Sequence, residues 1–317
     1  MTAPAAEIVG LHKRYSDGTE ALRGIDLRVP AGGVFALLGR NGSGKTTAVR
    51  IMVGLTSSTS GTVTVLGHDV ASERERVQAR IGVTLQEAAL DEVLTGREFL
   101  RFVARVQGRG RADAAARADE LLELFGLQHE GDRSIGAYSG GMKRRLDLAT
   151  ALIRTPELLF LDEPTTGLDP QSRRALWSEI SRLRSNGTTV FLTTQYLEEA
   201  EALADEIAII NRGLMIEQAS PDELRRRHGS TWLVLRGLAD TTAVAAAGGV
   251  DIEATSGSMR AAVTDADDAI VVLGRLRGAG LDPTDFEIKR DSLEEIFLTL
   301  TGTDATAGST QVEDFVG

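Results

Sequence analysis

Residues 36–47 read Ala-Leu-Leu-Gly-Arg-Asn-Gly-Ser-Gly-Lys-Thr-Thr and decide the fold of this chain. They contain the pattern G-x-x-x-x-G-K-[ST], in which Gly39 and Gly44 let backbone N–H groups approach phosphate oxygens because they carry no Cβ. Lys45 can reach the β- and γ-phosphates of a nucleoside triphosphate, and the hydroxyl of Thr46 can bind Mg²⁺. The stretch therefore predicts a phosphate-binding loop.

The sequence on both sides of the loop supports this interpretation. Residues 34–38 are all apolar, as in a buried strand, and residues 46–53 have the pattern of an opening helix. The N-terminus of that helix adds partial positive charge beside the phosphates. A glycine turn without a ligand is the alternative, and the strand–loop–helix order makes it the weaker one. The predicted binding residues are Gly39, Arg40, Asn41, Gly42, Ser43, Gly44, Lys45, Thr46 and Thr47.

The composition is that of a globular protein with a full core. The 317 residues are 42% hydrophobic and 26% charged, which allows one large domain or one large and one small domain. A net charge of −11 argues against nucleic acid or anionic lipid as the main partner. The chain has no cysteine, so disulfides and thiolate metal sites are excluded. It has no signal-peptide pattern and no apolar run near the ~18–20 residues that cross a bilayer, so we expect a soluble chain.

Alternating apolar residues predict short strands before and after the phosphate loop. These strands cover residues 7–11, 22–29, 62–66 and 81–85, and Gln86 follows the last one. From about residue 87 to 155 the pattern changes to helix, which predicts a helical subdomain. There Thr95 and Glu98 fit a capping box, with Phe99, Val103 and Val106 then on one helix face. A second helix is predicted at residues 112–125.

Two continuous apolar runs, residues 158–161 and 189–193, are typical of strands in a parallel sheet covered on both faces. The first run ends in Asp162 and Glu163. Two carboxylates at a strand end are weak evidence of an active site by themselves. Downstream of a phosphate loop, they predict a role in ATP hydrolysis. Asp162 is placed to hold Mg²⁺ through its water shell, and Glu163 to polarise the attacking water. A terminal hairpin is predicted at residues 206–217.

A second anion-binding loop is predicted at Tyr138-Ser-Gly-Gly-Met142, which precedes a basic amphipathic helix at residues 143–153. By itself such a loop can be only a cap and a turn. Because it stands just upstream of the Asp-Glu strand, the sequence resembles the ATP-binding subunit of ABC transporters over residues 5 to about 225. The motifs recur in order as Gly39–Thr46 (Walker A), Gln86 (Q-loop), Ser139–Met142 (signature), Leu158–Glu163 (Walker B) and Gly167–Asp169 (D-loop).

The resemblance implies a P-loop NTPase fold with a helical subdomain, and ATP with Mg²⁺ as ligands. Tyr15 matches the aromatic residue that stacks on adenine, although a packed loop aromatic is the alternative. Two copies would close head to tail as a homodimer, with one copy's signature against the ATP of the other. An integral membrane permease subunit would contact the helical subdomain, and the protein would be peripheral at the cytoplasmic face of the membrane. The implied signature and D-loop contacts to ATP are Ser139, Gly140, Gly141 and Asp169, and the implied Mg²⁺ residues are Thr46, Gln86 and Asp162.

Two positions depart from the family pattern. The signature has Tyr138 and Met142 where Leu and Gln are commoner, and Gln195 stands where most of the family has a switch histidine. Gln195 can donate a hydrogen bond to the γ-phosphate but cannot titrate. We therefore take Lys45, Glu163 and Gln195 as the catalytic residues.

The whole chain is similar to the daunorubicin/doxorubicin-resistance branch of bacterial drug exporters. That branch has glutamine at the switch position, an additional C-terminal domain and a separate membrane subunit. The resemblance implies export of hydrophobic drugs or natural products. Relatives with the same kind of ATP-binding subunit export lipids, polyketides or peptides. A soluble ABC-type ATPase acting on ribosomes or DNA is the rival class. One acidic domain without sustained heptads does not fit it.

A small α+β domain is expected after the ATP-binding domain, which covers residues 1–225. Residues 226–302 predict the ferredoxin-like order β-α-β-β-α-β and then a helix at residues 293–300, where Ser292 and Glu295 fit a capping box. Residues 303–317 are small and polar, which predicts a disordered tail. The domain could be a ligand sensor or a clasp between subunits. We favour the clasp, because no polar cluster in residues 230–300 suggests a ligand site.

Overall fold

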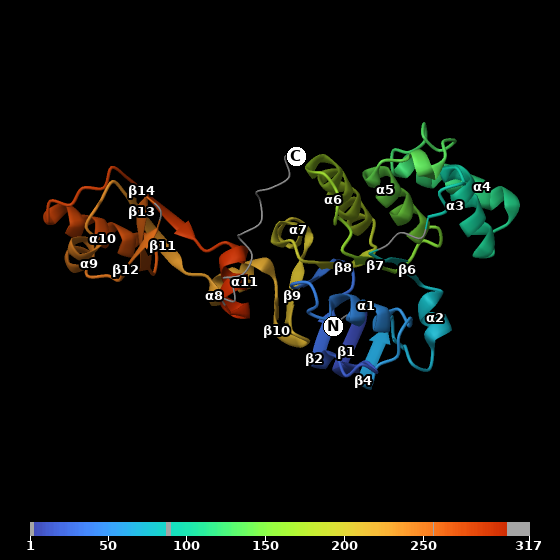
Figure 1. The fold of residues 1–317 in the computed structure, drawn as a ribbon, viewed down its shortest axis with the longest axis horizontal. Helices are drawn as coiled ribbons and strands as arrows, with labels where there is room; N and C mark the ends of the chain where they lie inside the picture. The colour runs from blue at the N-terminus through green and yellow to red at the C-terminus, as the bar shows by residue number, and fades with distance from the viewer. Residues whose placement is uncertain (1–2, 87–89, 256, 303–317) are drawn as a thin grey trace, which may run out of the picture. The chain divides into compact units, whose positions relative to one another are not determined.

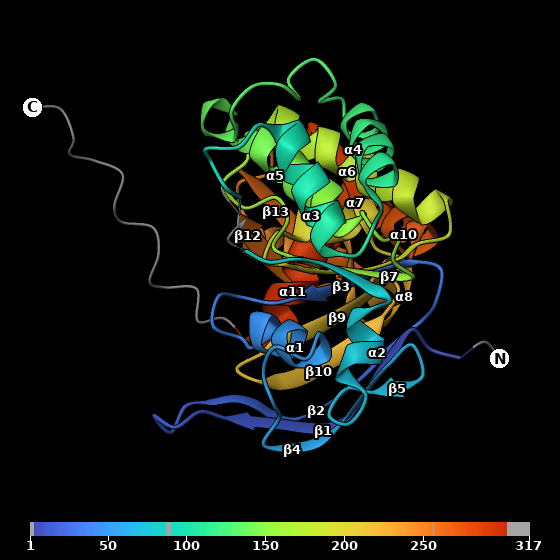
Figure 2. The ribbon, with the colours of Figure 1, turned by 90° about the vertical axis from the view of Figure 1, so that its right-hand side faces the viewer.

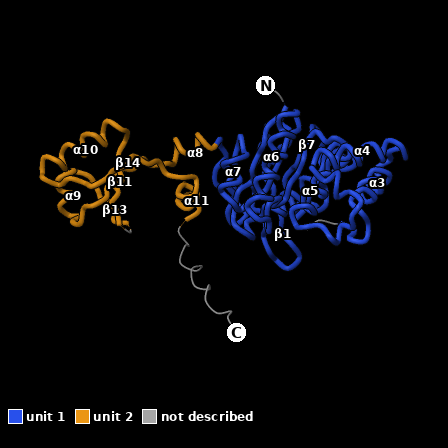
Figure 3. Tube along the Cα trace, turned by 90° about the horizontal axis from the view of Figure 1, so that it is seen from above, with its two compact units in different colours: residues 1–220 blue, residues 221–317 orange. Residues whose placement is uncertain are grey.

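The computed structural model describes residues 3–86, 90–255 and 257–302. The chain divides into two compact units, residues 1–220 and 221–317 (Figure 3). The predicted change of domain near residues 225–229 falls close to this division, at the end of α8 (Pro221–His228). The predicted tail at residues 303–317 lies outside the described residues, as do residues 87–89 of the predicted helical subdomain.

A six-stranded sheet forms the centre of the first unit, in the order β10-β9-β3-β8-β7-β6. The five strands from β9 to β6 are parallel, and β10 is antiparallel to β9 in the predicted hairpin. Every residue of β3, β7 and β8 is buried, which explains their continuous apolar sequences. The strands are β3 (Val34–Leu38), β6 (Ile81–Thr84), β7 (Leu158–Asp162), β8 (Thr189–Thr194), β9 (Glu206–Asn211) and β10 (Leu214–Ala219).

One face of this sheet is covered by α1 (Lys45–Met52) and by a second, antiparallel sheet (Figure 1). In the central sheet, Phe35 stacks on Phe191 at 5.5 Å between ring centroids, and Phe160 lies tilted against Phe191 at 5.4 Å. All three join the core formed with α1 and the second sheet. The predicted early strands are confirmed. The second sheet contains β2 (Glu20–Val29), β1 (Ala6–Arg14), β4 (Ser60–Val65) and β5 (His68–Asp69), in that order.

Helices cover the opposite face of the central sheet (Figure 2). α5 contacts β6, α6 contacts β8, and α7 contacts β3 and β8, while α3 and α4 pack together and against α5. The remaining short helices, α2 and η1, lie in connections. The helices are α2 (Arg74–Gln78), α3 (Gly96–Val106), α4 (Arg111–Leu124), η1 (Ile135–Ala137), α5 (Gly140–Ala151), α6 (Pro170–Ser185) and α7 (Leu197–Leu203).

The capping box at Thr95 and Glu98 is confirmed at the start of α3, but the predicted face of that helix is wrong in part. Phe99 is buried as expected, whereas Val106 at the helix end is 70% exposed. The buried face of α3 instead contains Phe99 with Leu100 and Ala104. Apolar periodicity predicts which residues share a face of α3. Contact with α4 and α5 decides which of those residues are buried.

The second unit contains the predicted order β-α-β-β-α-β, followed by a helix with the predicted capping box. Its antiparallel sheet has the order β12-β13-β11-β14, and α9 and α10 cover one face with a shared apolar core. Assignment to the ferredoxin-like class stays a prediction. α11 packs against α8. The elements are β11 (Thr231–Arg236), α9 (Thr241–Gly248), β12 (Ile252–Thr255), β13 (Ser258–Val263), α10 (Ala266–Gly278), β14 (Asp285–Arg290) and α11 (Leu293–Thr301).

The first unit holds the complete central sheet with its own core, so it should fold alone. We expect a chain ending at Ser220 to keep a cooperative thermal transition within ~5 °C of the corresponding transition of the full chain. Circular dichroism and differential scanning calorimetry would measure this. A truncated chain that aggregates or melts without cooperativity would show that the second unit is needed for the fold of the first.

Candidate active site

The phosphate loop lies between a buried strand and a helix, as predicted, since it joins β3 to α1. A Cβ on Gly39 would lie 2.5 Å from the carbonyl oxygen of Ile210. A Cβ on Gly44, where φ is 109°, would lie 2.5 Å from the carbonyl oxygen of Ala21. Only glycine fits at these two positions, so the tight curl of the loop follows from its sequence.

The ammonium group of Lys45 is buried under the loop. Its Nζ donates to the carbonyl oxygens of Gly39 at 2.8 Å and Arg40 at 3.2 Å, and it forms an ion pair with Oε1 of Glu163 at 3.1 Å. The side chains of Lys45 and Glu163 are only 3% and 7% exposed. A buried charge needs such partners, and a triphosphate in the loop would compete with Glu163 for Lys45.

The pairing of β7 with β8 places Asp162 opposite Thr193 at the carboxyl end of the sheet. The Thr193 hydroxyl donates to Oδ1 of Asp162 at 2.5 Å, and its oxygen accepts from the backbone N–H of Glu163 at 3.0 Å. Glu163 has a φ of 48°, a rare conformation for a side chain other than glycine. Thr193 thus positions both carboxylates. The sequence predicted Thr193 only as the last residue of the apolar run 189–193 and gave it no role in the site.

Thr46 and Asp162 fit a Mg²⁺ site. The Thr46 hydroxyl lies 3.3 Å from Oδ1 of Asp162, and the buried Oδ2 of Asp162 has no hydrogen-bond partner among the described residues. A buried carboxylate oxygen without a donor fits a cation or the water bound to one. Among the described residues, no group of three or more His, Cys, Asp or Glu side chains could hold a metal ion, so water and phosphate oxygens would complete the coordination of a Mg²⁺ here.

Gln86 and Tyr15 are two further residues of the predicted site. Gln86 follows β6, with an exposed side chain that makes no hydrogen bond to Thr46 or Asp162 among the described residues. The Tyr15 hydroxyl lies 3.3 Å from the Thr47 hydroxyl of α1, and the Tyr15 side chain is 37% exposed. Nζ of Lys13 lies over the ring at 4.9 Å from its centroid, so a base that stacks on Tyr15 would need the other face of the ring.

The start of the signature helix α5 lies against α6, the helix that follows the D-loop. Ser139 caps α5 by accepting from the backbone N–H of Met142 at 3.3 Å, and a Cβ on Gly141 would lie 2.5 Å from the hydroxyl of Ser172 in α6. Asp169 caps α6, and its hydrogen bonds from the Ser172 hydroxyl and backbone hold its pKa below the ordinary value. Within the described residues, neither loop donates or accepts a hydrogen bond with the phosphate loop of its own chain.

Gln195 follows β8 at the same edge of the sheet, and its half-buried side chain forms no hydrogen bond among the described residues. It is therefore available to a ligand. Nearby in sequence, Glu199 of α7 accepts from Trp177 Nε1 at 3.1 Å, and burial raises the pKa of Glu199.

Comparison with known proteins decides the family. Residues 22–166 match the ABC transporter family. The chain is 46% identical to the daunorubicin resistance ATP-binding protein DrrA3 of Streptomyces coeruleorubidus, over 96% of this chain and 98% of that protein. It is 40% identical to the doxorubicin resistance ATP-binding protein DrrA of Mycobacterium tuberculosis, over 97% of this chain and 96% of that protein. The chain belongs to the ABC transporter family.

Within the family, these relatives place the chain in the daunorubicin/doxorubicin-resistance branch of ATP-binding subunits. Among solved structures it is similar to CbiO1 of Clostridium perfringens, part of the ABC transporter complex CbiONQ. The TM-score is 0.66 at 27% identity, over 71% of this chain and 92% of that chain. The ATP-binding cassette MJ0796, solved as a dimer with ADP and phosphate, shares the fold with a TM-score of 0.63 at 24% identity, over 68% of this chain and 98% of that chain. No described helix is both long and apolar enough to span a membrane.

Arg144 of the signature helix α5 connects the motifs of this ABC domain. Its guanidinium donates to three strand-end carbonyls: Leu85 at 2.9 Å, Asp162 at 3.1 Å and Pro164 at 2.8 Å. It also pairs with Asp147 at 3.1 Å, and both side chains are about nine-tenths buried, at 10% and 13% exposure. Burial raises the pKa of Asp147 to about 6, although the nearby Arg144 opposes the shift. The sequence showed this helix as basic and amphipathic but gave no sign that Arg144 points inward.

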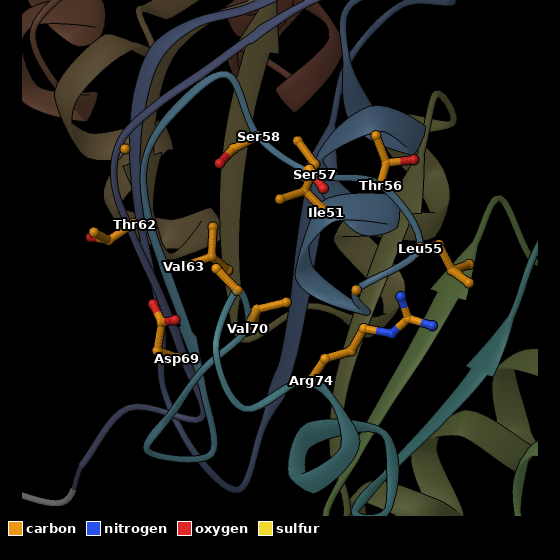
Figure 4. A pocket seen from close by; sticks show the side chains of 13 residues that line it. Ile51, Leu55, Thr56, Ser57, Ser58, Thr62, Val63, Asp69, Val70 and Arg74 are labelled. Carbon is orange, nitrogen blue, oxygen red and sulfur yellow. The ribbon is translucent and has the colours of Figure 1, made fainter.

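A cavity of about 320 Å³ lies beside the carboxyl end of α1 (Figure 4). Its lining includes Ile51, Leu55, Val63, Val70 and Arg74. None of the predicted ATP or Mg²⁺ residues lines it. The predicted ligand site is therefore the carboxyl edge of the central sheet and not this cavity.

The raised pKa of Asp147 predicts a pH dependence of stability. The folded state binds more protons than the unfolded state between the ordinary pKa of 3.8 and about 6, so this group lowers the free energy of unfolding as pH rises through that window. Asp147→Asn removes the effect. The free energy of unfolding of the variant, relative to wild type, should rise by up to about 3 kcal/mol between pH 4 and pH 7. Urea unfolding of both proteins would measure it, and a difference that stays constant with pH would contradict the assignment.

Proposed function

We propose that this chain is the subunit that binds and hydrolyses ATP to power a bacterial ABC exporter of hydrophobic drugs or natural products. The observation that carries the proposal is the meeting of Lys45, Glu163 and Asp162 at one edge of the sheet. A phosphate loop, a buried carboxylate beside it and a second carboxylate with an unpaired oxygen are the parts of a phosphoryl-transfer site. The cargo class rests on relatives of nearly equal length that are named for daunorubicin and doxorubicin resistance.

The geometry suggests how the residues work. Backbone N–H groups of the loop and the N-terminus of α1 bind the phosphates. Lys45 turns from Glu163 to the β- and γ-phosphates, and the freed carboxylate of Glu163 then orients and polarises the attacking water. Thr46, Gln86 and Asp162 would hold Mg²⁺, which would supply positive charge beside the phosphates. Gln195 donates to the γ-phosphate.

The site needs a second copy of the chain. Ser139 and Gly140 are exposed at the N-terminus of α5, and α5 covers the sheet face opposite to α1. A helix N-terminus that carries exposed N–H groups binds an anion from outside its own chain. We therefore propose a homodimer with two ATP molecules, each between one phosphate loop and the partner's signature, with Asp169 beside it.

The membrane subunit is proposed to contact the helical subdomain. Three apolar side chains there are strongly exposed: Val93 at 86%, Phe102 at 59% and Val106 at 70%. Exposed large apolar groups that gather on one subdomain mark a protein interface. The chain would thus be a peripheral protein at the cytoplasmic face of the membrane, held by an integral permease subunit.

The first test concerns Glu163. Glu163→Gln keeps the shape of the site but loses the carboxylate, so ATP hydrolysis should fall ~10²–10⁴-fold while ATP still binds. The variant should accumulate as an ATP-bound dimer in size-exclusion chromatography. Lys45→Ala is the matched control, because it should lose ATP affinity itself. Wild-type turnover in Glu163→Gln, or unchanged affinity in Lys45→Ala, would contradict the proposed site.

The second test concerns Gln195. If this position only donates a hydrogen bond to the γ-phosphate, wild type and Gln195→His should both hydrolyse ATP, and Gln195→Ala should lose ~10–10³-fold in turnover. An amide does not titrate, so the wild-type rate should show no inflection near pH ~6.5 that arises from this residue. Steady-state rates at several pH values would measure both effects. Equal turnover in wild type and Gln195→Ala would show that Gln195 is not part of the site.

A further inference from the structure

The second unit has a strand with an open edge. β14 is the last strand of the sheet β12-β13-β11-β14, and β11 is its only neighbour among the described strands. All six residues of β14, Asp285 to Arg290, are exposed. Natural edge strands are usually short, bulged or covered, because their free N–H and C=O groups attract another strand. Among the described residues, no strand or helix covers this regular six-residue edge.

The two faces of β14 differ in chemistry. Phe286 pairs with Leu235 and Ile288 with Leu233, so both lie on the face that α9 and α10 cover. Phe286 and Ile288 are nevertheless 51% and 43% exposed. Phe286 also lines a cavity of about 310 Å³ with Ile270 and other residues of α10. The apolar layer of the unit is therefore open at this edge.

The opposite face of β14 carries Asp285, Glu287 and Lys289. Arg236 of the neighbouring strand pairs with Asp285 at 2.5 Å and with Glu287 at 2.9 Å. The strand thus has acidic residues in its first half and basic residues, Lys289 and Arg290, at its end. Such a sequence is complementary in charge to itself when it runs in the opposite direction.

We propose that β14 pairs with β14 of a second copy of this chain, antiparallel about a two-fold axis at Ile288, and so joins two four-stranded sheets into one. Side chains directly opposite each other in an antiparallel pair lie on the same face, which limits the possible registers. The register centred on Glu287 places two carboxylates together, and that centred on Lys289 places two ammonium groups together. The register centred on Ile288 avoids both.

In this register, no two like charges within β14 lie opposite each other. Glu287 lies opposite the partner's Lys289 twice, which gives two ion pairs on the polar face, and Ile288 lies against its own copy on the apolar face. Phe286 lies opposite the partner's Arg290, whose guanidinium can stack on the ring. A symmetric contact between two identical patches is the commonest form of a homodimer.

The ends of the pairing also fit. Asp285 comes opposite the partner's Asp291, but each carboxylate is held within its own sheet. Asp285 pairs with Arg236, and Asp291 accepts from Trp232 Nε1 at 2.5 Å and from the backbone N–H of Ser230 at 2.8 Å. The other edge of the sheet, β12, is only four residues long and presents no exposed large apolar side chain. The exposed apolar side chains favour β14 over β12 as the edge that pairs. The self-complementary charges of β14 indicate that its partner strand is β14 of a second copy of this chain.

The pairing goes beyond the proposed function, because it uses no nucleotide and no residue of the ATP site. A ladder of five strand residues from each chain, Phe286 to Arg290, is a small contact, so we expect it to be weak by itself and strengthened when the first units also associate. Experiments on the full chain without nucleotide test the β14 pairing separately from the ATP-dependent dimer. If hydrolysis behaves as proposed and the pairing fails, only this inference is lost.

The chain has no cysteine, so single-cysteine variants report contacts without background. Ile288→Cys lies on the proposed axis, where a disulfide to its own copy has suitable geometry. Brief oxidation of the full-length, nucleotide-free protein, followed by a non-reducing gel, should give a covalent dimer at least ~10-fold faster than Ala254→Cys. Ala254 is the matched control, because it is also exposed and lies on the other edge strand, β12. Equal rates for the two variants would overturn the proposal.

The register has its own test. A mixture of Glu287→Cys and Lys289→Cys chains of different tag length should cross-link to the mixed dimer, faster than either variant cross-links to itself. Faster self-linking of either variant would overturn the register. Ile288→Asp places two carboxylates on the axis and should weaken dimerisation at least ~10-fold in sedimentation, while Ala254→Asp should not. Cross-linking of Ile288→Cys to a co-expressed membrane subunit, without the self-linked dimer, would assign the edge to that subunit and overturn the pairing.

Discussion

The parallel register of β3, β8 and β7 is the constraint on which the site depends. Because the three strands run in the same direction and end together, the phosphate loop after β3 and the carboxylates after β7 meet at one edge. Thr193 at the end of β8 joins them, since its hydroxyl contacts both Asp162 and the backbone of Glu163. A shift of β8 by one residue would turn Thr193 to the other face and separate the pair.

The same edge concentrates groups that are costly to bury. It contains an ion pair between Lys45 and Glu163, a carboxylate oxygen of Asp162 without a partner among the described residues, and a positive φ at Glu163. Such features persist because the packed sheet holds them. In the proposed function, each one would be relieved or used when phosphate and a cation bind.

Arg144 extends this preparation to the signature helix. One guanidinium contacts the backbone at Leu85, Asp162 and Pro164, so α5 cannot move without disturbing the ends of β6 and β7. In the proposed dimer, Arg144 would therefore link a signature loop in contact with the partner's ATP to the strand end that carries Glu163. The second unit adds a different surface, in which the edge of β14 is complementary to itself.

The sequence by itself determined the parts that follow local rules. The loop at Gly39–Thr46, the buried strands and the capping boxes at Thr95 and Ser292 follow from glycine geometry, apolar periodicity and short-range hydrogen bonds, and family resemblance added the signature and Gln195. The tertiary structure alone decided the partners: Thr193 under Asp162 and Glu163, Arg144 against three carbonyls, Val106 exposed although its pattern predicted burial, and the open edge at β14. These depend on strand order and on which neighbours cover a face, because contacts between residues far apart in sequence leave no pattern in either segment alone.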